Sequence, residues 1–189
     1  TKDLFEPALT KSIKLDKIII FEDFIDQKII DEYEMSKKKF KLSFFNNQKY
    51  LTDLFTIDGI NFFEYSYEGF KNIFLELLPD ALLINLTFKK ILKHINVKNV
   101  LTIRNRRIFD RTINYVSHIN KIKNFSLLHS NIGNSSNFIN KMGNFNYIYG
   151  VLLWNSIQKD LIKKDKNSSV KKFYVTGSPL FDFPKNDFN

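Results

Sequence analysis

The sequence predicts an α/β protein in which a mostly parallel sheet carries helices on both faces. From residue 98 onward, short apolar runs alternate with helical patterns, an order typical of consecutive β-α-β units. The chain has 189 residues, of which 43% are hydrophobic, so it can bury the core of one domain. We therefore treat residues 1–183 as one domain and 184–189 as the start of a linker or a frayed end.

The first hundred residues mix both kinds of pattern. We expect strands over two apolar runs, Leu15–Phe21 and Phe40–Phe45. Near-helical spacing of apolar residues predicts three helices, over Phe24–Lys39, Tyr67–Leu78 and Ala81–His94. Pro79 is expected to end the second helix and Asp80 to cap the third. An Asp-Gly pair within Thr56–Phe63 predicts a tight turn.

The second half of the chain is more regular. Apolar runs predict four short strands, over Lys98–Ile103, Asn124–Leu128, Tyr147–Leu153 and Lys171–Thr176. Helical patterns between them cover Arg107–Lys121 and Asn155–Lys164. Strands separated by helices in this way pair in parallel.

Composition excludes several kinds of site. The chain has no cysteine, which excludes disulfides, thiolate nucleophiles and Cys-based zinc or iron–sulfur sites. No apolar stretch reaches the roughly 20 residues of a membrane span, and no signal-peptide pattern opens the chain. We expect a cytoplasmic protein. The net charge of +9 favours an anionic partner, although scattered lysines also serve solubility alone.

Polar residues follow three of the predicted strands, where parallel sheets bind their ligands. They are the runs "RNRR" (104–107), "LLHSNIGNSSNF" (127–138) and "TGSPLFD" (176–182). Arginine side chains can pair with oxyanions bidentately, and a histidine after a strand can act as a general base. A solvated turn and a packed histidine are the structural alternatives. No phosphate-binding loop, dinucleotide fingerprint or GxSxG elbow is present.

Two further stretches carry a resemblance. The runs "GVLLWN" and "VKKFYVTGSPLFD" follow the strand that ends in His129. Over about Val100–Asp182, the chain resembles the N-terminal half of GT-B fold glycosyltransferases. It looks most like the capsule, teichoic-acid and surface-polysaccharide transferases that include the CDP-glycerol glycerophosphotransferase-like group. It departs from the pattern in having His129-Ser130 where that group commonly has His-Gly.

The resemblance implies a Rossmann-like acceptor-side domain of a two-domain enzyme, whose second domain supplies most of the nucleotide-sugar site. It implies that His129 is the catalytic base. The implied substrate-binding residues are Arg104, Asn105, Arg106, Arg107, Ser130, Asn131, Gly133 and Asn134. The implied donor or hinge turn consists of Thr176, Gly177, Ser178, Pro179 and Asp182. On this view the second domain is missing and the chain alone is inactive.

The expected partners are a nucleotide-sugar or CDP-glycerol donor and a polysaccharide or lipid-linked acceptor. We also expect peripheral contact with an anionic membrane at the inner face, and no cofactor, metal or nucleic acid. Two other functions remain open. A nucleotide-sugar 2-epimerase-like GT-B enzyme requires carboxylates and histidines clustered at the cleft. A non-enzymatic basic module that binds nucleic acid requires a basic and aromatic stripe on one face.

Overall fold

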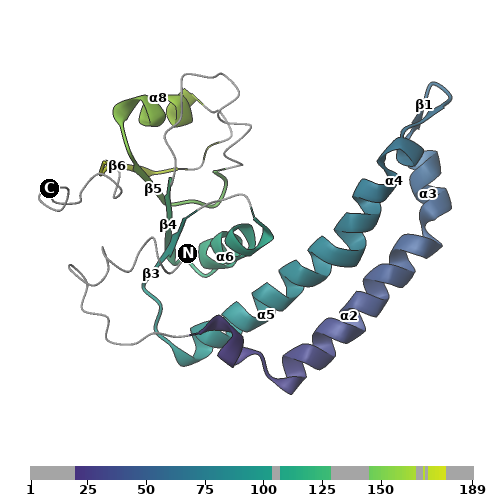
Figure 1. Cartoon of the computed structure of the whole chain (residues 1–189), viewed down its shortest axis with the longest axis horizontal. Coiled ribbons are helices and arrows are strands. Elements are labelled where there is room, and N and C mark those ends of the chain that lie inside the picture. Colours follow the sequence, from purple (N-terminus) through teal and green to yellow (C-terminus); the bar gives the residue numbers. More distant parts are fainter. Residues whose placement is uncertain (1–19, 104–106, 129–144, 165–167, 169, 178–189) are drawn as a thin grey trace, which may run out of the picture.

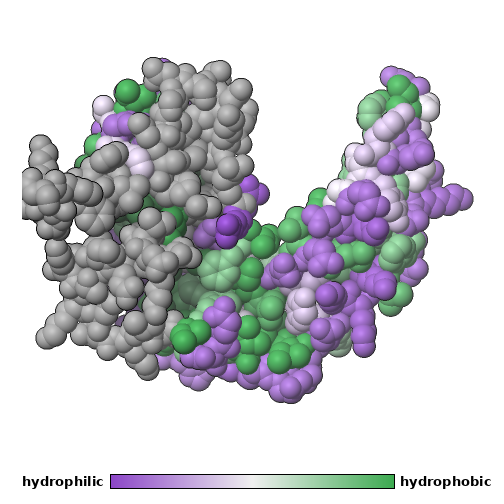
Figure 2. Space-filling model, viewed as in Figure 1, coloured by the Kyte–Doolittle hydropathy of each residue, from purple (hydrophilic) through white to green (hydrophobic). Residues whose placement is uncertain are grey.

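The computed structural model describes residues 20–103, 107–128, 145–164, 168 and 170–177. These residues form a long helical arm and an α/β part (Figure 1). The outer part of the arm projects away from the sheet and ends in a small hairpin, with an open concavity beside it (Figure 2). Most of Leu15–Phe21, expected to be a strand, lies outside the described residues, and Phe21 begins the short helix η1 (Phe21–Phe24).

The arm is an antiparallel pair of helical segments. Its outward half consists of α2 (Gln27–Asn46) and α3 (Gln48–Leu54). Its tip is the hairpin of β1 (Thr56–Ile57) and β2 (Ile60–Asn61). Its return half consists of α4 (Phe62–Asn72), the π-helical turn η2 (Ile73–Leu77) and α5 (Leu78–His94). Asp58 and Gly59 have φ angles of 51° and 79°, as two-residue hairpin turns require, so the predicted Asp-Gly turn is confirmed.

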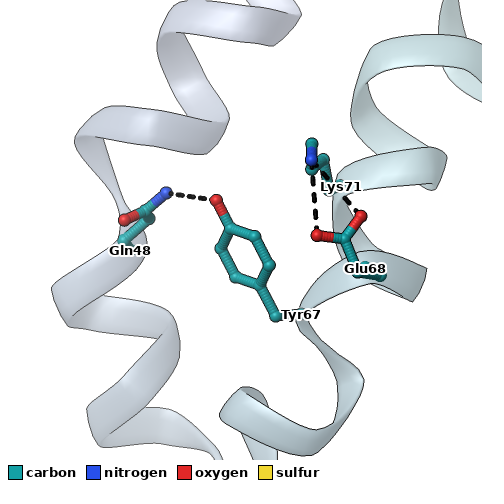
Figure 3. A network of polar contacts seen from close by, with 4 residues as sticks. All are labelled: Gln48, Tyr67, Glu68 and Lys71. Atoms are coloured by element: carbon teal, nitrogen blue, oxygen red, sulfur yellow. Dashed lines mark hydrogen bonds and ion pairs between the residues drawn. The ribbon is translucent and has the colours of Figure 1, made fainter.

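Aromatic packing holds the outer arm together. Phe44 on α2 is fully buried, and its ring contacts Phe63, Tyr67 and Phe74 from the returning half at centroid distances of 6.5, 5.5 and 5.6 Å. Figure 3 shows the polar contacts beside this cluster. Gln48 Nε2 donates to the Tyr67 hydroxyl at 3.3 Å, and Lys71 pairs with Glu68 one helical turn away at 3.3 Å.

Three predictions about the arm are wrong. Phe40–Phe45 is not a strand but the last part of α2, because helical spacing turns Phe44 toward the aromatic residues of the returning half. Pro79 does not end a helix, and Asp80 does not cap one: α5 begins at Leu78, continues directly from η2 and contains Asp80 in its first turn. A proline lacks an amide hydrogen and crowds the preceding turn, and the wider π turn is the local adjustment that lets the helical path continue.

The α/β part contains one parallel sheet in the order β3-β4-β5-β6. Its strands are β3 (Asn99–Thr102), β4 (Lys123–Leu127), β5 (Gly150–Leu153) and β6 (Lys172–Val175). Helix α6 (Ile108–Ile119) joins β3 to β4, and α8 (Ser156–Lys164) joins β5 to β6. The four predicted strands and both predicted helices are therefore confirmed, with small shifts in their ends.

The two helices that pack on the sheet within the described part of the chain share one face. Thr102 and Asn124 point toward α6 and bond to Asn114, while Val151 and Leu153 form a core with Ile162 of α8. The strand register places all four strand residues on the same face. A sequential strand order with right-handed crossovers has this result. Within these residues, the sheet thus departs from the expected helices on both faces.

Helix α5 connects the arm to the α/β part. Its buried residues Ile84, Phe88 and Ile91 pack against Ile113 and Val116 of α6. Lys90 of α5 also contacts α2: its Nζ lies 2.6 Å from Oδ2 of Asp26, at the start of that helix. The inner end of the arm therefore forms a further helical layer over α6.

Candidate functional site

The structure describes part of each of the three predicted strand-end segments (104–107, 127–138 and 176–182), and these parts lie at the carboxyl edge of the sheet. Arg107 immediately precedes α6, is exposed, and its carbonyl accepts the amide of Arg111 at 3.1 Å. Thr176 and Gly177 follow β6. The other predicted site residues lie outside the described part: Arg104, Asn105, Arg106, His129, Ser130, Asn131, Gly133, Asn134, Ser178, Pro179 and Asp182.

The turn after β5 is fixed by a reciprocal cap. Asn155 Oδ1 accepts the amide of Gln158 at 3.0 Å. Gln158 Oε1 accepts the amide of Trp154 at 2.7 Å. Gln158 is fully buried. Together the two hydrogen bonds form a variant of a capping box, and α8 starts directly at the edge of the sheet. The sequence indicated Asn155 as the start of the helix but not the role of Gln158.

The turn after β6 is anchored to the neighbouring strand. The Thr176 amide donates to the Leu153 carbonyl at 2.9 Å, and the Thr176 hydroxyl lies 3.4 Å from the same oxygen. Gly177 has a φ of 78°, a conformation that favours glycine. The predicted Gly-containing turn therefore begins here, while its role with a donor stays a prediction.

A pocket that the sequence did not reveal lies between α5, α6 and the segment before β5. Its volume is about 450 Å³, in the range of small-molecule sites. Its described lining is Ala81, Leu82, Asn85, Arg111, Thr112, Tyr115, Asn146 and Tyr147. These residues come from three distant stretches, none of which contains a motif, so only the fold brings them together.

The pocket wall is supported by a buried polar network. Asn124 and Asn114 are 2% and 1% exposed. Asn124 Nδ2 donates to the carbonyl of Tyr147 and lies 3.3 Å from Asn114 Oδ1. Asn124 Oδ1 accepts the amide of Tyr149 at 3.0 Å. Asn124 thus clamps the chain on both sides of Ile148.

This clamp holds Tyr147 in an unusual conformation. Its φ is 67°, which is uncommon for a bulky residue and costs free energy. Its ring meets Tyr115 edge to face, with centroids 5.3 Å apart and planes at 74°, and also contacts His118 at 5.2 Å. The strained backbone thereby presents an aromatic side chain at the pocket.

The α/β part is strongly basic. Its described acidic residues are Asp110 and Asp160. Its described basic residues are Lys98, Arg107, Arg111, Lys121, Lys123, Lys159, Lys163, Lys164, Lys171 and Lys172. Among the described residues, the excess of basic over acidic side chains therefore lies in the part that holds the sheet, and this field favours anionic ligands.

The face of the sheet opposite α6 and α8 carries exposed aromatic and apolar side chains. Leu101 and Tyr174 are 57% and 45% exposed. Phe125 packs against Tyr149 and Tyr174 at centroid distances of 5.7 and 6.2 Å. Lys123 Nζ lies 5.5 Å from the centre of the Tyr149 ring. A basic and aromatic surface is therefore present on this face.

The described residues contain no group of three or more His, Asp or Glu side chains arranged to hold a metal ion. Within the same part of the chain, none of the helices has both the length and the apolar character needed to cross a bilayer. Comparison with known proteins gives no family: no family model, curated protein or solved structure matches the chain significantly.

Proposed function

We propose that the chain is the acceptor-side domain of a GT-B type glycosyltransferase, or of a glycerophosphotransferase-like enzyme, that builds a surface polysaccharide. The observation that supports this proposal is the parallel sheet in sequential order, with Arg107, Asn155 and Thr176 following the ends of its strands. Open parallel sheets bind ligands at this edge. The enzyme class comes from the resemblance of the runs "GVLLWN" and "VKKFYVTGSPLFD", which contain β5 and β6 and the residues after them.

In the proposed reaction, an acceptor hydroxyl attacks the anomeric carbon of a nucleotide sugar, or the phosphorus of CDP-glycerol. His129 takes the hydroxyl proton as the new bond to oxygen forms. The bond to the nucleotide breaks, and the nucleotide leaves with the bonding electron pair. Arg104, Arg106 and Arg107 bind the anionic groups of the acceptor or donor, since guanidinium groups pair with phosphate oxygens.

The test is transfer by the protein as its gene encodes it, from UDP-sugars and CDP-glycerol to cell-envelope glycans. We expect His129→Ala to lower turnover by about 10²–10⁴-fold, the usual loss for a general base, with an unchanged melting temperature. His94→Ala, in a histidine at the end of α5, is the matched control and should retain turnover. Normal turnover of His129→Ala with reduced stability would make His129 a packing residue. Failure to transfer from any of these donors would reject the proposed class.

A second candidate function rests on the exposed face of the sheet. Phe125, Tyr149 and Tyr174 lie beside Lys123 there, and aromatic rings among lysines bind single-stranded nucleic acid by stacking and charge. We expect a labelled oligonucleotide to bind with a steep salt dependence and to lose affinity in Tyr174→Ala. No binding, or equal binding by Tyr174→Ala, would exclude this candidate.

A further inference from the structure

We propose that the pocket between α5, α6 and the segment before β5 binds a sugar unit that carries a carboxylate or a phosphate. This inference goes beyond the proposed function, because it adds a binding site that does not depend on catalysis. Asn146 and Tyr147 precede β5, so this wall of the pocket lies toward the amino-terminal edge of the sheet, whereas the proposed transfer takes place at the carboxyl edge. Helices α5 and α6, which line it, meet near the base of the concavity beside the arm (Figures 1 and 2).

The first argument is that the structure keeps a strained residue in the pocket wall. Tyr147 has a φ of 67°, and two buried asparagines, Asn124 and Asn114, hold the segment around it. Tyr147 itself is 43% exposed, so burial of its own ring does not account for this backbone conformation. Strain of this kind that is maintained by its surroundings is typical of ligand sites.

The shape of the aromatic corner favours a sugar over a nucleobase. The rings of Tyr115 and Tyr147 meet at 74° with centroids 5.3 Å apart, so they touch each other and leave no slot in which a flat base could lie between them. A sugar ring can place its C–H groups on one ring face and direct its hydroxyls to neighbouring polar groups. The amides of Asn85 and Asn146 and the Thr112 hydroxyl line the same pocket and can serve as donors and acceptors.

The charge of the pocket favours an anionic sugar. Among its described lining residues, Arg111 carries the formal charge, and the surrounding α/β part is strongly basic. A guanidinium group can pair bidentately with a carboxylate or with a phosphate. Uronic acids and sugar phosphates share this chemistry, and the experiment distinguishes them.

The experiment is a titration of the full chain, followed by the tyrosine ring signals in NMR spectra. The probes are glucuronic acid, glucose 6-phosphate, glucose, UMP and inorganic phosphate. We expect at least one acidic sugar to shift the signals of Tyr115 and Tyr147 and to bind about tenfold more tightly than glucose, as one charge-assisted hydrogen bond allows. The acidic sugar that binds identifies the carboxylate or the phosphate as the recognised group. No shift with either acidic sugar, or tighter binding of UMP or inorganic phosphate, would overturn the proposal.

Two variants test the pocket directly. Tyr147→Gly removes the ring and suits the left-handed backbone, and we expect it to lower affinity by tenfold or more. Arg111→Gln, at an exposed helical position, should bring the affinities for acidic sugar and glucose together. Tyr65→Ala is the control, because Tyr65 is 84% exposed on the arm, and it should bind normally. If Tyr147→Gly does not fold, Arg111→Gln decides: an unchanged preference for the acidic sugar in that variant would contradict the proposal.

Discussion

The ring of Phe125 on β4 lies over the backbone of Gly150 on β5. A Cβ atom added at Gly150 would come within 2.7 Å of Phe125 Cδ1 and 2.8 Å of Cε1. Tyr149 and Tyr174 surround the Phe125 ring, so the ring has little room to move away. The absence of a side chain at Gly150 is therefore what allows this aromatic cluster to form on the exposed face of the sheet.

We expect Gly150→Ala to destabilise the protein by about 1–3 kcal/mol, the usual effect of overpacking. The free energy of unfolding in urea measures it, and Phe125→Leu in the same chain should recover part of the loss. Gly69→Ala is the matched control: Gly69 lies on α4 with nothing within 4 Å of the added Cβ, so alanine there should stabilise by about 0.5–1 kcal/mol. Equal effects of the two substitutions would contradict the role of Phe125.

The aromatic cluster of the arm gives a second prediction. Phe44 is fully buried, whereas its neighbour Phe45 is 43% exposed. We expect Phe44→Ala to reduce the free energy of unfolding by about 3–5 kcal/mol, because it leaves a cavity among Phe63, Tyr67 and Phe74. Phe45→Ala should have a clearly smaller effect. If the larger loss occurred at Phe45, the helical register of α2 would be wrong.

Local patterns were sufficient to predict the sheet and the helical segments of the arm, but not how far α2 extends. The strand expected at Asn124–Leu128 is β4 (Lys123–Leu127), because a short apolar run bounded by polar residues carries its own signal. Phe40–Phe45 has the composition of a strand, but it continues α2, and its Phe44 packs against Phe63, Tyr67 and Phe74 of the returning half. Tertiary packing overrides local propensity in such segments.

The candidate site divides in the same way. Arg107, Thr176 and Gly177 follow the strands after which the sequence placed them, because the position of a strand end is a local property. The pocket depends instead on how α5 packs over α6, and its support by Asn114 and Asn124 requires a helix and a strand to face each other. No pattern within a single stretch of sequence contains that information.

The buried asparagine network yields a third prediction. Asn124→Leu keeps the size of the side chain but removes the partner of the Tyr147 carbonyl and of Asn114. We expect a loss of at least about 2 kcal/mol, since unsatisfied buried polar groups cost about 1–3 kcal/mol each. Asn72→Leu, at an exposed position on α4, should change stability little. If Asn124→Leu proved neutral, the network would not be what holds Tyr147 in place.

The last prediction concerns the effect of acid on the inner end of the arm, where α2 meets α5. Asp26 caps α2 by accepting the Ile29 amide at 2.9 Å, and its other oxygen accepts Lys90 Nζ at 2.6 Å. The hydrogen bond from Lys90, followed by that from Ile29, lowers the pKa of Asp26 below its ordinary value of 3.8. A carboxylate whose pKa is lowered by folding stabilises the protein above its unfolded pKa, and this contribution is lost as the pH falls through the folded pKa.

Asp26→Asn keeps an oxygen for the cap but removes the charge. We therefore expect the variant to melt below the parent protein at neutral pH, and the gap in melting temperature to close as the pH falls below about 4. Lys90→Gln should show the same gap and the same pH dependence, and the two substitutions together should add little to either one, because they break one pair. A gap in melting temperature that stays constant from neutral pH into acid would show that Asp26 acts only through its cap and not through its pair with Lys90.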